Sequence, residues 1–130
     1  MKLDNILISK DRKTVKLCDF GVSRFMPKNE VIYEKCGTPA YIAPEIISDL
    51  GYEGLSSDLW SLGVVLYSMV IGAVPFKANS MKDLHKLILK GEFNIPSFVS
   101  PVIADVIRRL IVLVPSDRMN IRELMCHPWI

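Results

Sequence analysis

Two short polar side chains, Asn5 and Asp19, flank a pair of apolar runs that are typical of a β-hairpin. Residues 5–8 and 15–18 predict two short strands, and the polar run between them predicts the turn. With the turn centred on residues 11 and 12, Asn5 faces Cys18, so Asn5 and Asp19 lie side by side at the open end of the hairpin. An amide beside a carboxylate is a donor pair that suits Mg²⁺. The same residue types also cap and start ordinary turns, and these two residues alone favour that second interpretation.

The elements after the hairpin should form a mostly helical lobe. Residues 19–42 lack periodicity and contain two glycines and two prolines, which predicts a long ordered loop of the kind that is usually functional. Apolar spacing and capping residues then predict helical segments. These are a short turn at 44–49, then helices at 57–71, 81–90 and 101–113, and a last short helix after Asn120.

The second of these segments is apolar enough to raise the question of a membrane. Residues 59–76 carry no charge over 18 positions, which is close to the length of a membrane span. Two glycines, two serines and a proline interrupt this stretch, and the neighbouring segments are amphipathic. We therefore expect a helix buried at the centre of the lobe.

Composition narrows the class of protein further. Half of the 130 residues are hydrophobic, which excludes intrinsic disorder. The 16 basic and 14 acidic residues give a net charge of +2, so there is no electrostatic case for nucleic acid or a membrane as partner. Cys18, Cys36 and Cys126 form no Cys-x-x-Cys pair, which argues against a disulfide framework or a zinc site and indicates a reducing compartment.

Several short motifs follow one another in a fixed order along the chain. They are Lys2 with Asn5 in the spacing Lys-x-x-Asn, Asp-Phe-Gly at 19–21, Cys-Gly-Thr-Pro-Ala-Tyr at 36–41, Ala-Pro-Glu at 43–45, Asp-Leu-Trp-Ser-Leu-Gly at 58–63, and Arg118. Together they resemble the C-terminal lobe of a eukaryotic protein kinase, and the resemblance runs over residues 1–130. It implies a mainly α fold: a helical bundle around a buried central helix, with a small β-hairpin that carries the metal-binding residues. The whole chain is then a partial protein kinase domain.

The resemblance also implies cofactors and a substrate class. ATP and Mg²⁺ are the expected cofactors, with Asn5 and Asp19 at the metal positions. Leu7, Cys18 and Asp19 would line the nucleotide site, although Leu7 and Cys18 are equally expected as plain apolar strand residues. Lys2 would contact the transferred phosphate.

Thr38 would join Lys2 beside the hydroxyl of a Ser or Thr substrate. A lysine at position 2 together with Gly37-Thr38-Pro39 resembles serine/threonine kinases. The residues around 33–47 and the ending His-Pro-Trp resemble the calcium/calmodulin-dependent and AMP-activated group. Protein substrates are the implied partners.

The loop after the hairpin matches the activation segment of kinases, including Phe20, Gly21, Gly37 and Pro39. Aligned on Cys-Gly-Thr-Pro, Glu34 takes the position where related kinases carry a phosphorylated Thr or Ser. Its carboxylate would supply about one negative charge where a phosphate supplies 1.5 to 2. Pairing with the arginine of a His-Arg-Asp motif and a solvated loop position are equally open interpretations of Glu34.

Two further matches are structural. Glu45 and Arg118 match a buried ion pair that fixes the end of the activation segment to the last helices. Asp58 matches a carboxylate at the start of the central helix that accepts hydrogen bonds from the backbone of the catalytic loop.

The kinase catalytic loop reads His-Arg-Asp-Leu-Lys-x-x-Asn, and Met1 takes the place of its Leu. We therefore expect the general base and the N-terminal lobe to be missing from these 130 residues, and the isolated chain to transfer no phosphate. The alternative is a pseudokinase or half-kinase that acts as a non-catalytic interaction module. The expected location is intracellular, in the cytoplasm or the nucleus.

Overall fold

The computed structural model describes residues 1–27, 30–48 and 50–130. The described chain is mainly helical, with one two-stranded antiparallel sheet. The strands are β1 (Ile6–Ile8) and β2 (Val15–Leu17). The helices are α1 (Pro44–Ile47), α2 (Gly54–Ile71), α3 (Met81–Lys90), α4 (Pro101–Leu110) and α5 (Ile121–Met125), and 3₁₀ turns lie at Leu3–Asn5, Pro39–Tyr41 and Pro115–Asp117.

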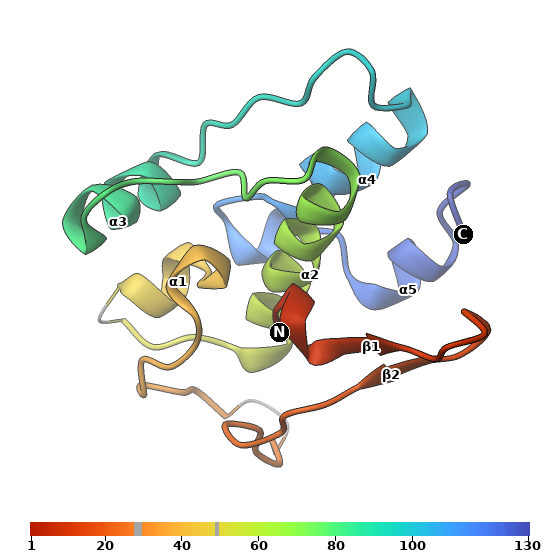
Figure 1. The fold of residues 1–130 in the computed structure, drawn as a ribbon. Coiled ribbons are helices and arrows are strands. Elements are labelled where there is room, and N and C mark those ends of the chain that lie inside the picture. Colours follow the sequence, from red (N-terminus) through yellow and green to blue (C-terminus); the bar gives the residue numbers. More distant parts are fainter. Residues whose placement is uncertain (28–29, 49) are drawn as a thin grey trace.

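Helix α2 runs through the middle of the lobe (Figure 1). Helices α1 and α3 lie on one side of it, α4 and α5 lie on the other, and the β1–β2 hairpin lies near its N-terminal half. Trp60 and Val64 of α2 and Ile107 of α4 are fully buried, and they belong to one continuous apolar core. The predicted bundle around a buried central helix is therefore confirmed.

Helix α2 is long and apolar enough to cross a membrane by length and composition, yet half of it is buried within this lobe. Its serines do not leave polar groups unpaired in the core. Ser61 donates to the backbone carbonyl of Tyr41 at 2.9 Å and Ser68 to that of Val64 at 2.8 Å. Hydrogen bonds of this kind let small hydroxyls occupy a buried helix at little cost.

One glycine sets how closely α2 and α4 approach each other. A Cβ atom on Gly63 would lie 2.8 Å from both Leu110 Cβ and Ile111 Cγ1. Only glycine therefore allows the C-terminal end of α4 to pack against α2 at this distance, which explains why a helix former is absent there.

Some predicted boundaries were wrong by a few residues. Helix α2 begins at Gly54, three residues before the predicted start at Ser57. Helix α4 ends at Leu110 instead of Leu113, because the Met119 N–H bonds the Arg109 carbonyl at 2.8 Å and Arg118 takes the Val112 carbonyl. The chain is thereby drawn away from the helix axis. The turn predicted for 44–49 is helical only to Ile47, and its last residue lies outside the described part.

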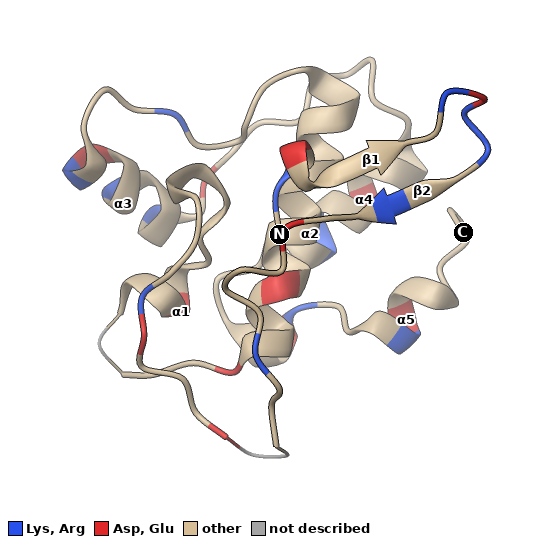
Figure 2. Cartoon of the chain, turned by 60° about the horizontal axis from the view of Figure 1, so that its bottom comes forward, with Lys and Arg blue, Asp and Glu red and all other residues tan. Residues whose placement is uncertain are grey.

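Charged residues of both signs are spread along the chain over the whole lobe (Figure 2). Basic residues gather at the tip of the hairpin, where Lys10, Arg12 and Lys13 surround the single carboxylate of Asp11. That carboxylate accepts hydrogen bonds from the Ser9 hydroxyl and the Lys13 backbone N–H, and these bonds lower the pKa of Asp11. Asp11 is thus part of the turn itself.

Candidate active site

The hairpin brings Asn5 and Asp19 together as the register predicted. Ile8 pairs with Val15, Ile6 pairs with Leu17, and the Cys18 N–H donates to the Asn5 carbonyl at 2.9 Å. As a result, Asn5 Nδ2 lies 3.5 Å from Asp19 Oδ2. These two side chains, 14 residues apart in sequence, are neighbours because the strands are paired.

The backbone at Asp19 turns sharply to place its carboxylate. Asp19 has a φ of 61°, a left-handed conformation that Asp tolerates better than most residues. The Gly21 N–H donates to Asp19 Oδ1 at 3.3 Å, and a Cβ on Gly21 would lie 3.3 Å from the same oxygen. Gly21 therefore leaves room for the carboxylate and also orients it.

The donor set at this end of the hairpin suits one kind of cation. In residues 1–27, 30–48 and 50–130, no group of three or more His, Cys, Asp or Glu side chains could hold a metal ion. One carboxylate and one amide remain, and this is a poor set for a metal held by protein alone. Mg²⁺ is commonly bound by one or two carboxylates with phosphate oxygens and water as the other ligands. The residues present therefore fit Mg²⁺ in company with a phosphate ligand.

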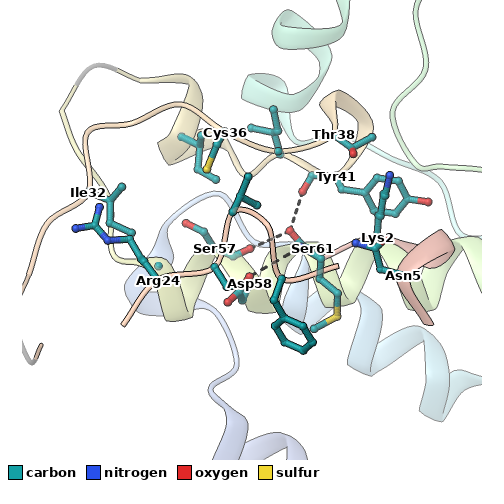
Figure 3. Close-up of a pocket in the computed structure, with 18 of the residues that line it drawn as sticks. Lys2, Asn5, Arg24, Ile32, Cys36, Thr38, Tyr41, Ser57, Asp58 and Ser61 are labelled. Carbon is teal, nitrogen blue, oxygen red and sulfur yellow. Dashed lines mark hydrogen bonds and ion pairs between the residues drawn. The ribbon is translucent and has the colours of Figure 1, made fainter. Parts of the chain in front are cut away.

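Asn5 and Asp19 open onto a pocket that several other predicted residues share. It is lined by Lys2, Cys18, Phe20, Gly37, Thr38 and Asp58 among others. Figure 3 shows Lys2, Asn5 and Thr38 on one side of this pocket and Arg24 on the opposite side. Lys2 precedes the hairpin and Thr38 lies near the end of the long loop, so two residues 36 positions apart in the sequence line the same pocket.

Three other predicted site residues, Leu7, Gly21 and Pro39, do not line this pocket, and a fourth, Phe20, lines it. Leu7, on β1, does not line it and is about half exposed. Gly21 and Pro39 act through the backbone, the first beside Asp19 and the second at the start of a 3₁₀ turn. Phe20 lines the pocket but is largely exposed.

Asp58 lies on α2 one turn in from its N-terminus, not at the helix start as expected. Its carboxylate is 4.0 Å from the amino group of Met1, and its side chain is 66 % exposed. This contact is with the first residue of the segment that also carries Lys2 and Asn5. The Asp58 side chain thus faces residues 1–5, the segment that matches the end of the catalytic loop. Among the contacts of the described residues, none is a hydrogen bond from the backbone of that segment to Asp58.

The end of the long loop is fixed by a buried ion pair, as the resemblance implied. Arg118 Nη1 lies 2.8 Å from Glu45 Oε1 and Nη2 lies 3.1 Å from Oε2, so the pairing is bidentate. The Arg118 side chain is fully buried and also donates to the carbonyls of Ser56 and Val112. Its guanidinium lies 5.3 Å from the centre of the Trp60 ring.

The pKa of Glu45 reflects two opposing effects. Burial disfavours the charged carboxylate, but hydrogen bonds from Arg118 and Ser57 and the charge of the guanidinium outweigh that cost. The pKa of Glu45 is therefore lowered, and the carboxylate stays ionised at neutral pH. Ser57 donates to Glu45 Oε1 at 2.8 Å, so all three side chains act together.

Sequence reasoning missed two residues that hold the long loop, Tyr52 from outside it and Arg24 from within it. Tyr52 pairs with Ile32 in an isolated antiparallel bridge, and its hydroxyl donates to the Glu34 carbonyl at 2.8 Å. Arg24 forms ion pairs with Glu30 and Glu34. Neither residue belongs to a repeated pattern. The signal that could have found Tyr52 is its place between two glycines, Gly51 and Gly54, just before the central helix.

Comparison with known proteins bears directly on this site. The model of the protein kinase domain family matches residues 1–130. The protein kinase domain-containing protein ppk9 of Schizosaccharomyces pombe is 42 % identical over 129 residues, which is 99 % of this chain and 24 % of that protein. The serine/threonine-protein kinase kin-29 of Caenorhabditis briggsae is 43 % identical over 129 residues, 99 % of this chain and 16 % of that protein.

A third relative, the CBL-interacting protein kinase 20 of Oryza sativa, is 37 % identical over 136 residues, 99 % of this chain and 29 % of its own length. The chain thus spans less than a third of each of these curated relatives. Proteins of this family generally use ATP and Mg²⁺. The match over residues 1–130 and these identities show that the chain belongs to the protein kinase family.

Proposed function

We propose that this chain is the metal- and substrate-binding part of a serine/threonine protein kinase, which transfers the γ-phosphate of ATP to Ser or Thr hydroxyls of protein substrates. One observation carries the proposal. Asn5 and Asp19 lie 3.5 Å apart at the edge of a pocket that Lys2 and Thr38 also line. A metal-binding pair, a cation for phosphate and a hydroxyl donor are thus gathered in one place.

Each side chain has a distinct task in this proposal. Magnesium bound with ATP would neutralise charge on the phosphates during transfer. Asp19 and Asn5 would supply the protein oxygens that hold the metal, and the Gly21 N–H keeps the Asp19 carboxylate oriented. The Lys2 ammonium attracts oxygens of the transferred phosphoryl group, and the Thr38 hydroxyl orients the acceptor beside it.

The acceptor class is inferred from Lys2 with Gly37-Thr38-Pro39 and from relatives named as serine/threonine-protein kinases. The general base is expected on the residue that precedes Met1 in the family pattern. Transfer by a kinase also requires an N-terminal lobe, which lies outside the family pattern matched by these 130 residues. All three cysteines are unpaired, which supports an intracellular location in the cytoplasm or nucleus.

Metal–nucleotide binding tests the proposal directly. ¹⁵N NMR spectra of the 130-residue chain are recorded during titration with ATP and Mg²⁺ together, and with each alone. We expect weak binding with shifts centred on Asn5, Asp19 and Gly21. Asp19→Asn should abolish the shifts that require Mg²⁺. Asp4→Asn is the matched control, because Asp4 is an exposed neighbour that does not line the pocket. Equal binding by both variants would refute the metal site.

Phosphoryl transfer is the second test. We expect the isolated chain to phosphorylate no protein substrate above background, because half of the nucleotide cleft and the base are expected elsewhere. Robust transfer that is lost in Asp19→Ala would contradict this. The coding sequence upstream of Met1 separates the two functional classes. An in-frame His-Arg-Asp supports a kinase, and a stop codon there supports a non-catalytic half-kinase.

A further inference from the structure

We propose that Tyr52 is a positioning residue, which holds residues 30–36 of the long loop so that Thr38 stays in the substrate side of the site. This inference rests on the proposed function for its consequence, but its physical basis is independent of it. Residues 30–36 are called the tethered segment below. The segment leads directly into Gly37 and Thr38, which line the pocket.

Tyr52 binds the tethered segment through three hydrogen bonds. The Ile32 N–H donates to the Tyr52 carbonyl and the Tyr52 N–H donates to the Ile32 carbonyl, both at 2.9 Å. The Tyr52 hydroxyl then reaches two residues further and donates to the Glu34 carbonyl at 2.8 Å. The bonds fix both the position and the direction of the segment, because they contact it at two points.

Packing supports the same pairing. Ile32 and Tyr52 are both buried, at 7 % and 8 % exposure, and both belong to the main core. The glycines beside Tyr52 make room for the segment. A Cβ on Gly51 would lie 2.5 Å from Val31 Cγ1, and Gly51 has a φ of +79°. A Cβ on Gly54 would lie 3.2 Å from Ile32 Cδ1. Residues 51–54 are thus shaped to receive residues 31–33.

The Tyr52 hydroxyl stays protonated, so its hydrogen bond persists at physiological pH. Burial, the contact with Cys36 and the charge of Glu34 together raise the pKa of Tyr52 to about 12. The Cys36 sulfur lies 3.9 Å from the Tyr52 hydroxyl, so Tyr52 also contacts the residue before Gly37.

Arg24 holds the outer side of the same segment more weakly. Its guanidinium pairs with Glu30, and Nη1 lies 3.9 Å from Glu34 Oε2. The Glu34 side chain is 83 % exposed, so water and salt screen this pair. Arg24 therefore supplies, within the described residues, a partner for the Glu34 carboxylate other than the arginine of a His-Arg-Asp motif. Tyr52 therefore restrains the tethered segment more strongly than Arg24 does.

Amide hydrogen exchange in the 130-residue chain tests this, with Tyr52→Phe as the variant. The substitution keeps the ring and removes only the hydroxyl that bonds Glu34. We expect exchange of the Ile32 N–H, which donates to the Tyr52 carbonyl, to rise roughly two- to tenfold, the effect of one lost hydrogen bond. Arg24→Gln should raise it by no more than about threefold.

Tyr67→Phe is a closely matched control. The Tyr67 hydroxyl also donates to a backbone carbonyl, that of Asn94, at 2.9 Å, and Tyr67 is 7 % exposed. Burial raises its pKa as well. The two variants should lose similar overall stability, while only Tyr52→Phe raises exchange at Ile32 in the tethered segment. Equal exchange in this segment in the two variants would overturn the proposal.

Kinetics of the phosphate-transferring full-length protein give the second readout. Tyr52→Phe should raise the KM for the protein substrate several-fold and leave the KM for ATP unchanged, because Asn5 and Asp19 are held by the hairpin. A change in both constants, or in neither, would contradict a positioning role. If the full-length protein without substitutions transfers no phosphate, the proposed function fails. The exchange result still decides whether Tyr52 restrains the tethered segment.

Discussion

The helical core and the edge that carries the candidate site differ in how their side chains are satisfied. Trp60, Val64 and Ile107 of the core are completely buried, and Arg118 finds all of its partners inside the chain. At the edge, which comprises residues 1–27, Phe20 and Phe25 are 65 % and 90 % exposed. Within the described part of the chain, the Asp19 carboxylate there has an amide at 3.5 Å and a backbone N–H at 3.3 Å as its hydrogen-bond partners.

This difference indicates that the core and the edge have separate roles. The core residues stabilise the lobe through apolar packing and, at Arg118, through hydrogen bonds within the chain; Trp60 Nε1 is the exception among the described residues, because it is buried without a hydrogen-bond partner. The edge residues keep unused hydrogen-bonding capacity and apolar surface, which a nucleotide, a metal and a second lobe would use. Segments with few buried contacts open more easily than the core, and functional segments are commonly of this kind.

The largest expected effect comes from breaking the buried pair on the core side. Arg118→Met leaves the Glu45 carboxylate buried without its partner, and we expect a loss of about 3–5 kcal/mol in the free energy of unfolding. Urea denaturation measures it. The double variant Arg118→Met/Glu45→Met is the control and should recover part of the loss, because no charge is then left unpaired. A loss below about 1 kcal/mol in the single variant would contradict the importance of burial here.

A smaller loss is expected where α2 meets α4. Gly63→Ala would place a methyl group 2.8 Å from atoms of Leu110 and Ile111. Alanine favours a helix over glycine by about 1 kcal/mol, but overpacking a core costs about 1–3 kcal/mol, so we expect net destabilisation. Thermal unfolding measures it. Gly54→Ala, in the same helix, is the control and should cost less, because its nearest neighbour is the flexible end of Ile32. Net stabilisation by Gly63→Ala would show that α4 can shift away.

These features differ in how far they could be predicted from sequence. The hairpin register and α3 were predicted correctly, because strand alternation, Ser80 at the N-cap and Gly91 at the C-cap are local signals. Gly91 has a φ of 68°, which glycine adopts readily. The start of α2 was missed because Glu53, at its N-cap, makes no side-chain capping hydrogen bond.

The contacts of the candidate site were also predictable only where local sequence signals determine them. Asn5 beside Asp19 follows from strand pairing, so it was predictable from a few residues. The contact of Tyr52 with Glu34 depends on two segments 18 residues apart that meet only in the folded lobe. No periodicity or motif in the sequence encodes that meeting. The contact between Glu45 and Arg118 was predicted only from the kinase resemblance. These residues are 73 positions apart, and their spacing alone could not have predicted the pair.

Acid should remove the stability that the core pair of Glu45 and Arg118 contributes. The pKa of folded Glu45 lies below its ordinary value of 4.5, so its contribution to stability is present above about pH 4.5 and is lost as the pH falls through the folded pKa. We expect the free energy of unfolding to fall below pH 4.5 more steeply in the parent than in Glu45→Gln. Glu92→Gln is the control and should keep the parent's slope. Equal slopes in the parent and Glu45→Gln would exclude Glu45 as the acid-sensitive group.

The smallest effect is expected for an ion pair that has the same length as the buried one. Lys90 Nζ lies 2.8 Å from Glu92 Oε2, and Arg118 Nη1 lies 2.8 Å from Glu45 Oε1. The Lys90 and Glu92 side chains are 63 % and 72 % exposed, so water screens their attraction and ordering two long side chains costs entropy. We expect Lys90→Ala to change the free energy of unfolding by no more than about 0.5 kcal/mol, and 1 M NaCl to remove even that difference. Urea denaturation at low and high salt measures both values. A loss comparable with that of Arg118→Met would mean that distance, and not burial, decides the strength of ion pairs in this lobe.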